Sequence, residues 1–168
     1  MDLITSLPQV SNYDVIVVYI DHFSKQTHVI PTTSNVDADG IADIHYCEII
    51  QLHGISTKIV LDCGPQFAAQ LMQALYHCLR ITHTLTTVYH PQSNGQTECV
   101  NWEVKQHLQL FTNSCQDDWV KYLPTAKFVL NSHLHLAHQK TPFKLIYRYK
   151  PDFTVPAGPP TKFLALDQ

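Results

Sequence analysis

Asp14-Val15-Ile16-Val17-Val18-Tyr19-Ile20-Asp21 is a continuous apolar run, rich in β-branched residues and bounded by an aspartate at each end. Such a run is typical of a strand that is buried on both faces. Residues 1–5 form a second, shorter apolar stretch, and the turn-rich residues 8–12 between the two predict a β-hairpin. In this hairpin we expect residue 5 to pair near residue 14, and residue 2 near residue 17.

Outward from this hairpin, strand and helix patterns alternate along the chain. A third strand is expected at residues 27–30, ended by Pro31. The later elements are predicted as helices at 37–53, 67–79, 96–113 and 118–132 and strands at 58–62 and 81–86. Three strands in series followed by strand–helix alternation predict an α/β domain with a five-stranded mixed sheet flanked by helices. This domain covers residues 1–153, and residues 154–168 are expected to form an extended, Pro-rich C-terminal tail.

Two acidic residues stand in strings that suit a metal-dependent active site. Asp62 ends a strand in Val60-Leu61-Asp62-Cys63-Gly64-Pro65-Gln66-Phe67, and Glu98 begins a helix in Tyr89-His90-Pro91-Gln92-Ser93-Asn94-Gly95-Gln96-Thr97-Glu98-Cys99-Val100-Asn101. The sequence leaves 35 residues between the two acids. Carboxylate oxygens bind Mg²⁺, and two such ions can hold the attacking and leaving oxygens of a phosphoryl transfer. Each acid alone also has a structural explanation, as a turn former or as a favourable helix N-terminal charge.

At these strings the chain resembles the integrase catalytic cores of retroviruses and gypsy-type LTR retrotransposons, whose signature is Asp, Asp-35-Glu. The resemblance covers residues 1 to about 153 and implies an RNase H-like fold. It implies that Asp2, Asp62 and Glu98 are the catalytic acids and bind two Mg²⁺ or Mn²⁺ ions. It also implies DNA 3′-end processing and strand transfer, with element ends and target duplex as partners. We expect the protein to form a homo-oligomer, to act in the nucleus or cytoplasm and not to bind a membrane.

The first catalytic acid is a choice between Asp2 and Asp21. In the expected register Asp21 lies about four residues beyond Asp2, roughly 13 Å at the rise of a strand, so the two cannot serve one metal ion. The string Met1-Asp2-Leu3-Ile4 resembles the start of the family's first strand, which favours Asp2. Because only Met1 precedes it, this strand is expected to be truncated and to fray.

The helix that carries Glu98 has two distinct faces. Its apolar residues are expected to form a buried stripe: Val100, Val104, Leu108 and Phe111. Polar residues of this helix and of the preceding loop are expected to contact nucleic acid: Gln92, Asn94, Asn101 and Lys105. The resemblance implies that Lys105 binds the terminal phosphates of a DNA end. The alternative is an ordinary lysine exposed to solvent. Trp102 is expected either to stack on a base or to shield the core.

Charge and cysteine placement leave further alternatives open. The net charge of −3 is unfavourable for binding DNA, but residues 119–151 hold six basic side chains and no acid, which suits either a DNA-facing surface or a solvated one. Cys63 and Cys99 flank the acids where the family carries polar or basic residues. They favour a second hypothesis, a catalytically inactive retrotransposon-derived domain that binds nucleic acid or protein partners. A nuclease of the RNase H type is disfavoured by the helical Glu98.

Overall fold

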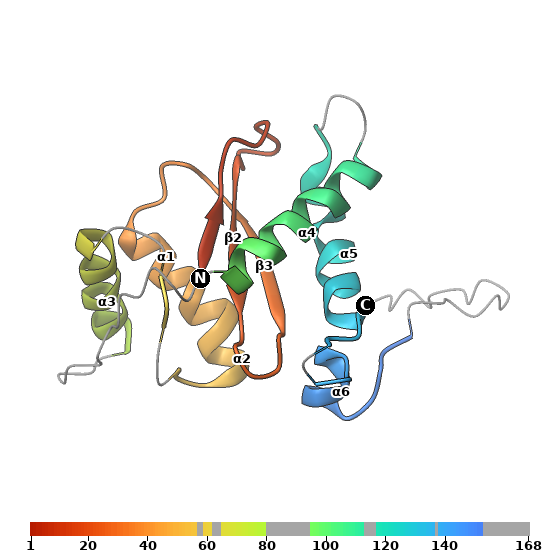
Figure 1. The fold of residues 1–168 in the computed structure, drawn as a ribbon. Coiled ribbons are helices and arrows are strands. Elements are labelled where there is room, and N and C mark those ends of the chain that lie inside the picture. Colours follow the sequence, from red (N-terminus) through yellow and green to blue (C-terminus); the bar gives the residue numbers. More distant parts are fainter. Residues whose placement is uncertain (57–58, 62–64, 80–94, 113–116, 137, 153–168) are drawn as a thin grey trace, which may run out of the picture.

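The computed structural model describes residues 1–56, 59–61, 65–79, 95–112, 117–136 and 138–152. An antiparallel sheet of three strands stands at its centre, in the order β1-β2-β3 (Figure 1). These strands are β1 (Asp2–Ile4), β2 (Val15–Ile20) and β3 (Thr27–Thr32). The predicted hairpin and the third strand are therefore confirmed.

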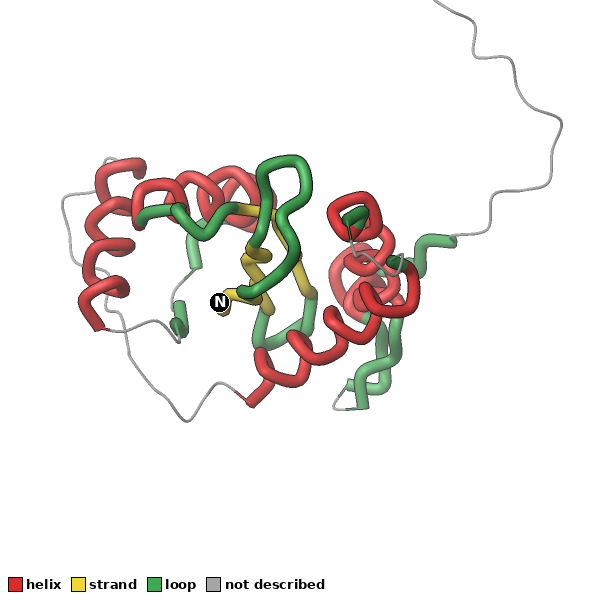
Figure 2. The backbone as a smooth tube through the Cα atoms, turned by 90° about the horizontal axis from the view of Figure 1, so that it is seen from above, coloured by secondary structure: helices red, strands yellow, loops and turns green. Residues whose placement is uncertain are grey.

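Helices cover both faces of this sheet. Seen from above, the strands lie between two groups of helices (Figure 2). On one face lie α1 (Ala38–His45), the π-helix η1 (Tyr46–Ile50), α2 (Gln51–His53) and α3 (Pro65–Leu79). On the other face lie α4 (Gly95–Phe111) and α5 (Trp119–Ser132), with the short helix α6 (Pro142–Tyr147) beyond them. The four predicted helices are confirmed to within two residues at each end, whereas α6 was not predicted.

The central strand β2 contributes to two hydrophobic clusters, one on each face of the sheet. Val17 and Tyr19 pack with residues of α1, η1 and α3, and Ile16 and Val18 pack with residues of α4 and α5. Ile16, Val17 and Val18 are fully buried. The apolar run at residues 14–21 is thus a strand buried on both faces, as its sequence predicts.

The loop between β1 and β2 is hydrogen-bonded to Trp119 at the start of α5. The Trp119 side chain is only 1% exposed, and its Nε1 donates a hydrogen bond to the carbonyl oxygen of Pro8 at 2.8 Å. A buried indole N–H needs such a partner. This contact ties the loop of the hairpin to the helical layer that covers it.

Two details of the hairpin region differ from expectation. Asp2 pairs with Val18 instead of residue 17, so the register differs from the expected one by one residue. The loop between the strands contains a Val10–Tyr13 bridge and residues in the left-handed conformation, which set this register. Pro31 lies inside β3, opposite Ile16, and does not end the strand. Within the described sheet β3 is an edge strand, which tolerates a proline because its outward side needs no N–H donor.

The five-stranded sheet remains a prediction. Residues 59–61 are not part of a strand, and the strand expected at 81–86 lies outside the described residues, as do the ends of the 58–62 segment and the tail at 154–168. Among the helices that the structure describes, none has the length and apolarity to cross a membrane.

Candidate active site

A hydrogen bond between two side chains joins the strand that carries Asp2 to the helix that carries Glu98. Asn101 Nδ2 donates a hydrogen bond to Asp2 Oδ2 at 2.5 Å, and the backbone N–H of Leu3 donates to Asp2 Oδ1 at 2.8 Å. Because Glu98 and Asn101 are three residues apart on α4, they lie on neighbouring positions of one helix face. The side chain of Glu98 itself lies outside the described part. Sequence reasoning placed Asn101 on this face but missed its contact with Asp2.

The apolar side of α4 explains why the helix lies against β1 and β2. Val104 is fully buried and Leu108 is nearly so, and both pack in a cluster with Ile4, Ile16 and Val18. Phe111, which was expected in the same buried stripe, is 47% exposed, and that prediction is wrong. It is the last residue of α4, where the helix no longer faces the sheet, and its ring stacks on Tyr122 with centroids 6.3 Å apart.

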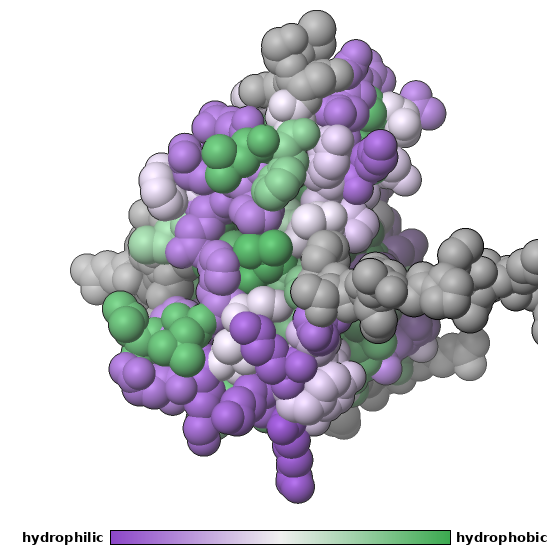
Figure 3. All heavy atoms as spheres, turned by 90° about the vertical axis from the view of Figure 1, so that its right-hand side faces the viewer, coloured by the Kyte–Doolittle hydropathy of each residue, from purple (hydrophilic) through white to green (hydrophobic). Residues whose placement is uncertain are grey.

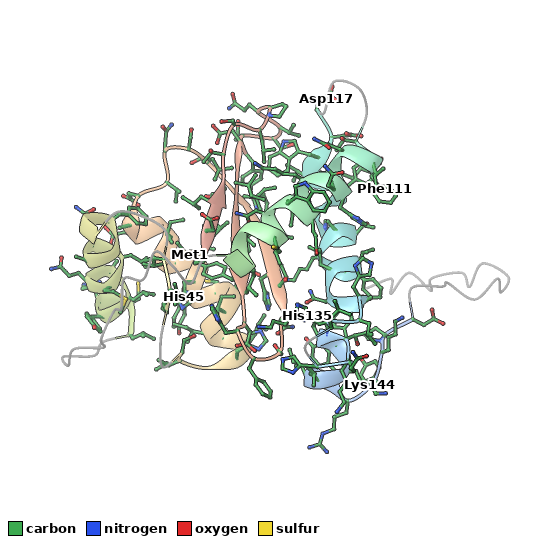
Figure 4. All side chains as sticks on the ribbon, in the orientation of Figure 1. Met1, His45, Phe111, Asp117, His135 and Lys144 are labelled. Carbon is green, nitrogen blue, oxygen red and sulfur yellow. The ribbon has the colours of Figure 1, made fainter. Side chains whose placement is uncertain are left out.

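The segment before Asp62 lies beside the start of β1. The N-terminal ammonium group of Met1 donates a hydrogen bond to the carbonyl oxygen of Val60 at 2.8 Å. Leu61, which follows, is buried in the same cluster as Met1. Asp62 lies outside the described residues, so the expectation that it shares a metal site with Asp2 and Glu98 stays a prediction. Figure 4 shows Met1 near the middle of the molecule, close to the first turn of α4 in that view.

Asp21 has a structural role in the turn between β2 and β3. Its Oδ2 accepts hydrogen bonds from the backbone N–H of Ser24 at 2.8 Å and from Ser24 Oγ at 2.6 Å. Burial acts to raise the pKa of the Asp21 carboxyl, but these hydrogen bonds, with the backbone N–H of Phe23 and the charge of His22, bring the pKa below its ordinary value. Asp21 lies three residues beyond Val18, the partner of Asp2, or about 10 Å along a strand. The two aspartates are therefore in separate environments.

The expected nucleic-acid contacts divide into described and undescribed residues. Lys105 is exposed on α4, one turn beyond Asn101. Trp102 is 64% exposed, so it does not shield the core. Gln92 and Asn94 lie outside the described residues. Of the two cysteines that flank the acids, Cys99 is exposed, and Cys63 also lies outside the described part.

The oxygen atoms at the Asp2–Asn101 contact suit a hard divalent cation. Asn101 Oδ1 is buried beside the Asp2 carboxylate, and among the described residues no donor is hydrogen-bonded to it. Carboxylate and amide oxygens are ligands that Mg²⁺ and Mn²⁺ accept. The residues that are present thus fit such an ion. No three His, Cys, Asp or Glu side chains cluster in the described part, which includes neither Asp62 nor the Glu98 side chain.

Comparison with known proteins finds relatives among transposon polyproteins. The chain is 30% identical over 151 residues to the Tf2-3, Tf2-4 and Tf2-5 polyproteins of Schizosaccharomyces pombe. This match covers 90% of the chain, and the chain spans only 11% of the length of each polyprotein. No family model matches the sequence.

Solved integrase structures share the fold. The HTLV-2 integrase catalytic core domain in complex with magnesium, in its trimeric form, matches 85% of this chain and 92% of its own, with a TM-score of 0.61 and 20% identity. A simian T-cell lymphotropic virus intasome, in complex with the PP2A regulatory subunit B56 gamma, matches 95% of this chain and 57% of its own, with a TM-score of 0.63 and 23% identity. The chain is thus related by sequence, over nine-tenths of its length, to a segment of these transposon polyproteins, and it shares the α/β fold of the retroviral integrase catalytic cores.

Proposed function

We propose that the chain is the catalytic core of a polynucleotidyl transferase that processes DNA 3′ ends and joins them to a target duplex. Asp2, Asp62 and Glu98 would hold two Mg²⁺ or Mn²⁺ ions. The hydrogen bond between Asn101 and Asp2 carries this proposal, because it joins the strand of the first acid to the helix of the third. The oxygen donors at this contact and the relatives' family support the same reaction class.

The contact between Met1 and Val60 supports the inclusion of Asp62. Asp62 follows Val60 by two residues, and two residues of chain span at most about 7 Å. Val60 in turn is hydrogen-bonded to the residue next to Asp2. Three acids that come from a strand, a strand end and a helix would thus converge at one edge of the sheet.

Several residues of this chain would act on the DNA directly or through the acids. Asn101 would fix the orientation of the Asp2 carboxylate through its amide N–H. Lys105, exposed one turn further along α4, would bind a phosphate of the DNA end as a point charge. Gln92 and Asn94 would contact the DNA from the loop that precedes α4. Bound divalent ions would activate the attacking hydroxyl and stabilise the leaving oxygen.

The proposed partners are DNA ends, a target duplex and further copies of the same chain. The core domain of the HTLV-2 integrase exists in dimeric and trimeric forms, which supports the proposal of a homo-oligomer. Access to chromosomal DNA would require that the protein acts in the nucleus.

The test is a strand-transfer assay with labelled oligonucleotide ends and Mn²⁺ or Mg²⁺. The unchanged chain is expected to nick and join these ends, and Asp2→Asn and Asp62→Asn are expected to abolish both reactions. Asp21→Asn is the matched control, since it removes one carboxylate from a turn and should keep activity. Loss of activity only in Asp21→Asn would overturn the assignment of the first acid.

The same assay separates the competing hypotheses. A folded chain that binds DNA but performs no chemistry with either metal ion would support the inactive domain, and the substitutions at Cys63 and Cys99 would then be its first explanation. Cleavage of an RNA–DNA hybrid in place of DNA ends would support an RNase H-type nuclease. Activity that persists in Asp62→Asn would show that the signal came from a contaminating enzyme.

A further inference from the structure

The surface around α6 combines exposed basic and aromatic side chains in a way that the proposed active site does not use. We call these residues the α6 patch: Lys140, Lys144, Tyr147, Arg148, Tyr149 and Lys150. All six are exposed, and the two tyrosines have exposed fractions of 48% and 63%. Figure 4 shows Lys144 on the outer side of α6, well apart from Met1. On the side of the molecule that carries α5 and α6, hydrophilic and hydrophobic side chains alternate over short distances (Figure 3).

The aromatic rings of this region form a continuous row that starts in α5. Phe128 of α5 lies 5.2 Å from Phe143 between ring centroids, Phe143 lies 5.8 Å from Tyr147, and Tyr147 lies 6.3 Å from Tyr149. The inner members hold the row on the helical layer. The outer members present their rings to solvent, and an exposed ring on a fixed support is suited to stack on another flat group.

The backbone that carries the patch is held at the start of α6. Thr141 Oγ1 accepts a hydrogen bond from the backbone N–H of Lys144 at 3.1 Å, and Pro142 occupies the first helical position. Both Thr141 and Pro142 are buried. Lys144 and Tyr147 are three residues apart on α6 and so share one side of this helix, and Arg148 follows directly as its C-terminal cap. The cations and rings are thus arranged by a capped element.

Arg148 occupies a backbone conformation that favours glycine. Its φ of 65° and ψ of 0° place it in the left-handed region at the C-terminal cap of α6. Glycine adopts this conformation without strain, whereas a side chain with a Cβ does not. A long cationic side chain at such a position stabilises the helix end less than glycine would, which points to a role in binding.

The charge around the patch is suited to a polyanion. Residues 119–151 hold no acidic side chain, although the whole chain has a net charge of −3. Asp152 is the first acid after this segment. Positive charges beside exposed rings are the combination that binds single strands, because phosphates pair with the cations while unpaired bases stack on the rings. A duplex or an acidic peptide offers the charge but no free base.

We propose that the α6 patch is a binding site for single-stranded nucleic acid. Bases stack on Tyr147 and Tyr149, and the backbone phosphates contact the surrounding cations: Lys140, Lys144, Arg148 and Lys150. This site needs no divalent ion and no catalytic acid, so it goes beyond the proposed strand transfer and does not depend on it.

The first test measures binding of the full chain to a fluorescein-labelled 20-residue oligothymidylate by fluorescence anisotropy in EDTA. The single strand is expected to bind more tightly than a blunt duplex of the same length. Three or four phosphate contacts predict that affinity falls about 20- to 50-fold between 50 and 200 mM salt, at a slope of roughly −0.7 per contact. Equal affinity for the duplex would overturn the proposal, as would displacement of the strand by polyglutamate at the same charge concentration.

Matched variants separate stacking from charge. The double variant Tyr147→Phe/Tyr149→Phe keeps both ring faces and should bind like the unchanged chain, whereas Tyr147→Ala/Tyr149→Ala should lose at least roughly 5-fold per stacked base. Full affinity in the double alanine variant would refute the stacking role. Circular dichroism of both variants checks that the fold is kept.

Arg148→Gly gives a test that a loss of fold cannot imitate. Removing the strained side chain should raise the melting temperature by a few degrees while it weakens binding of the oligothymidylate several-fold. Lys121→Gln is the control for charge alone: Lys121 lies over the ring of Tyr122 near the start of α5, outside the patch, and its removal should weaken binding much less. Equal losses in Arg148→Gly and Lys121→Gln would reduce the patch to general surface charge.

Discussion

Replacing Asn101 tests the contact on which the candidate active site depends. Asn101→Ala removes a hydrogen bond to a carboxylate, an interaction of roughly 1.5–3 kcal/mol when buried. Both partners are half-buried, which lowers this figure, and alanine favours the helix by about half a kcal/mol. The expected net loss in the free energy of unfolding is about 1 kcal/mol, or about 2–4 °C in melting temperature for a chain of this size.

Asn101→Asp keeps the shape and places a second carboxylate against Asp2. Two like charges about 4 Å apart repel by up to about 4 kcal/mol at an effective dielectric constant near 20, so this variant should be clearly less stable than Asn101→Ala at pH 7. The repulsion raises the pKa of the pair, and stability should therefore recover as the pH falls and one carboxyl is protonated. Added Mn²⁺ should also restore it, because the two carboxylates then share a cation.

Urea-induced unfolding followed by far-UV circular dichroism measures these differences. Gln106→Ala is the control on the same helix. Gln106 is exposed and its side chain is hydrogen-bonded to that of Gln109, so its effect should stay below about 0.5 kcal/mol. The reasoning is refuted if Asn101→Asp is as stable as Asn101→Ala at pH 7 and does not respond to Mn²⁺. Asp2 and residue 101 would then not be neighbours in solution.

Three further outcomes are expected. Lys105→Ala should weaken binding to DNA ends more than to duplex interiors in a gel-shift comparison, and equal losses would reduce Lys105 to a general surface charge. Asn131→Ala should lower the free energy of unfolding by about 2–4 kcal/mol, because it leaves the buried N–H and C=O of Thr27 without their 2.8 Å partners, and a loss below 1 kcal/mol would contradict this bond pattern. Burial, aided by the positive charges of Lys127 and His53, lowers the pKa of His28 from 6.5 to about 4. Between about pH 6.5 and pH 4 the unfolded chain binds a proton on His28 that the folded chain does not bind. Stability is therefore fully present above about pH 6.5 and falls as the pH drops toward 4. His28→Gln should flatten this slope in urea titrations at each pH.

The sequence predicts the parts of the fold that rest on long apolar patterns. The run at residues 14–21 identified the central strand because no other element could bury so many β-branched side chains on both faces. The register was wrong by one residue, since the sequence does not show that Ser6, Ser11 and Asn12 adopt left-handed conformations. Phe111 fitted the helical period but lies at the end of α4, where period alone does not say that the sheet has ended.

Features of the fold that depend on short sequence signals, or on contacts between distant residues, were not predicted. Thr141 followed by Pro142 is a helix-start signal that could have revealed α6. The π-helix at Tyr46–Ile50 shifts the phase of the helical face. Leu52, which a regular α-helical period would place on the same side as Ile41, is therefore 62% exposed. The pairing of Asn101 with Asp2 joins residues 99 positions apart, and no local pattern encodes such a contact.

The two tryptophans of the chain lie in opposite surroundings, and this makes the protein its own optical reporter. Trp119 is enclosed where α5 meets the hairpin loop, so its emission should be blue-shifted and insensitive to acrylamide, whereas Trp102 on the outer face of α4 should emit at long wavelength and be quenched readily. A ligand that covers α4 then alters only the red component, and unfolding alters mainly the blue one. One unlabelled sample can therefore distinguish occupancy of the candidate active-site face from loss of the fold in a single titration.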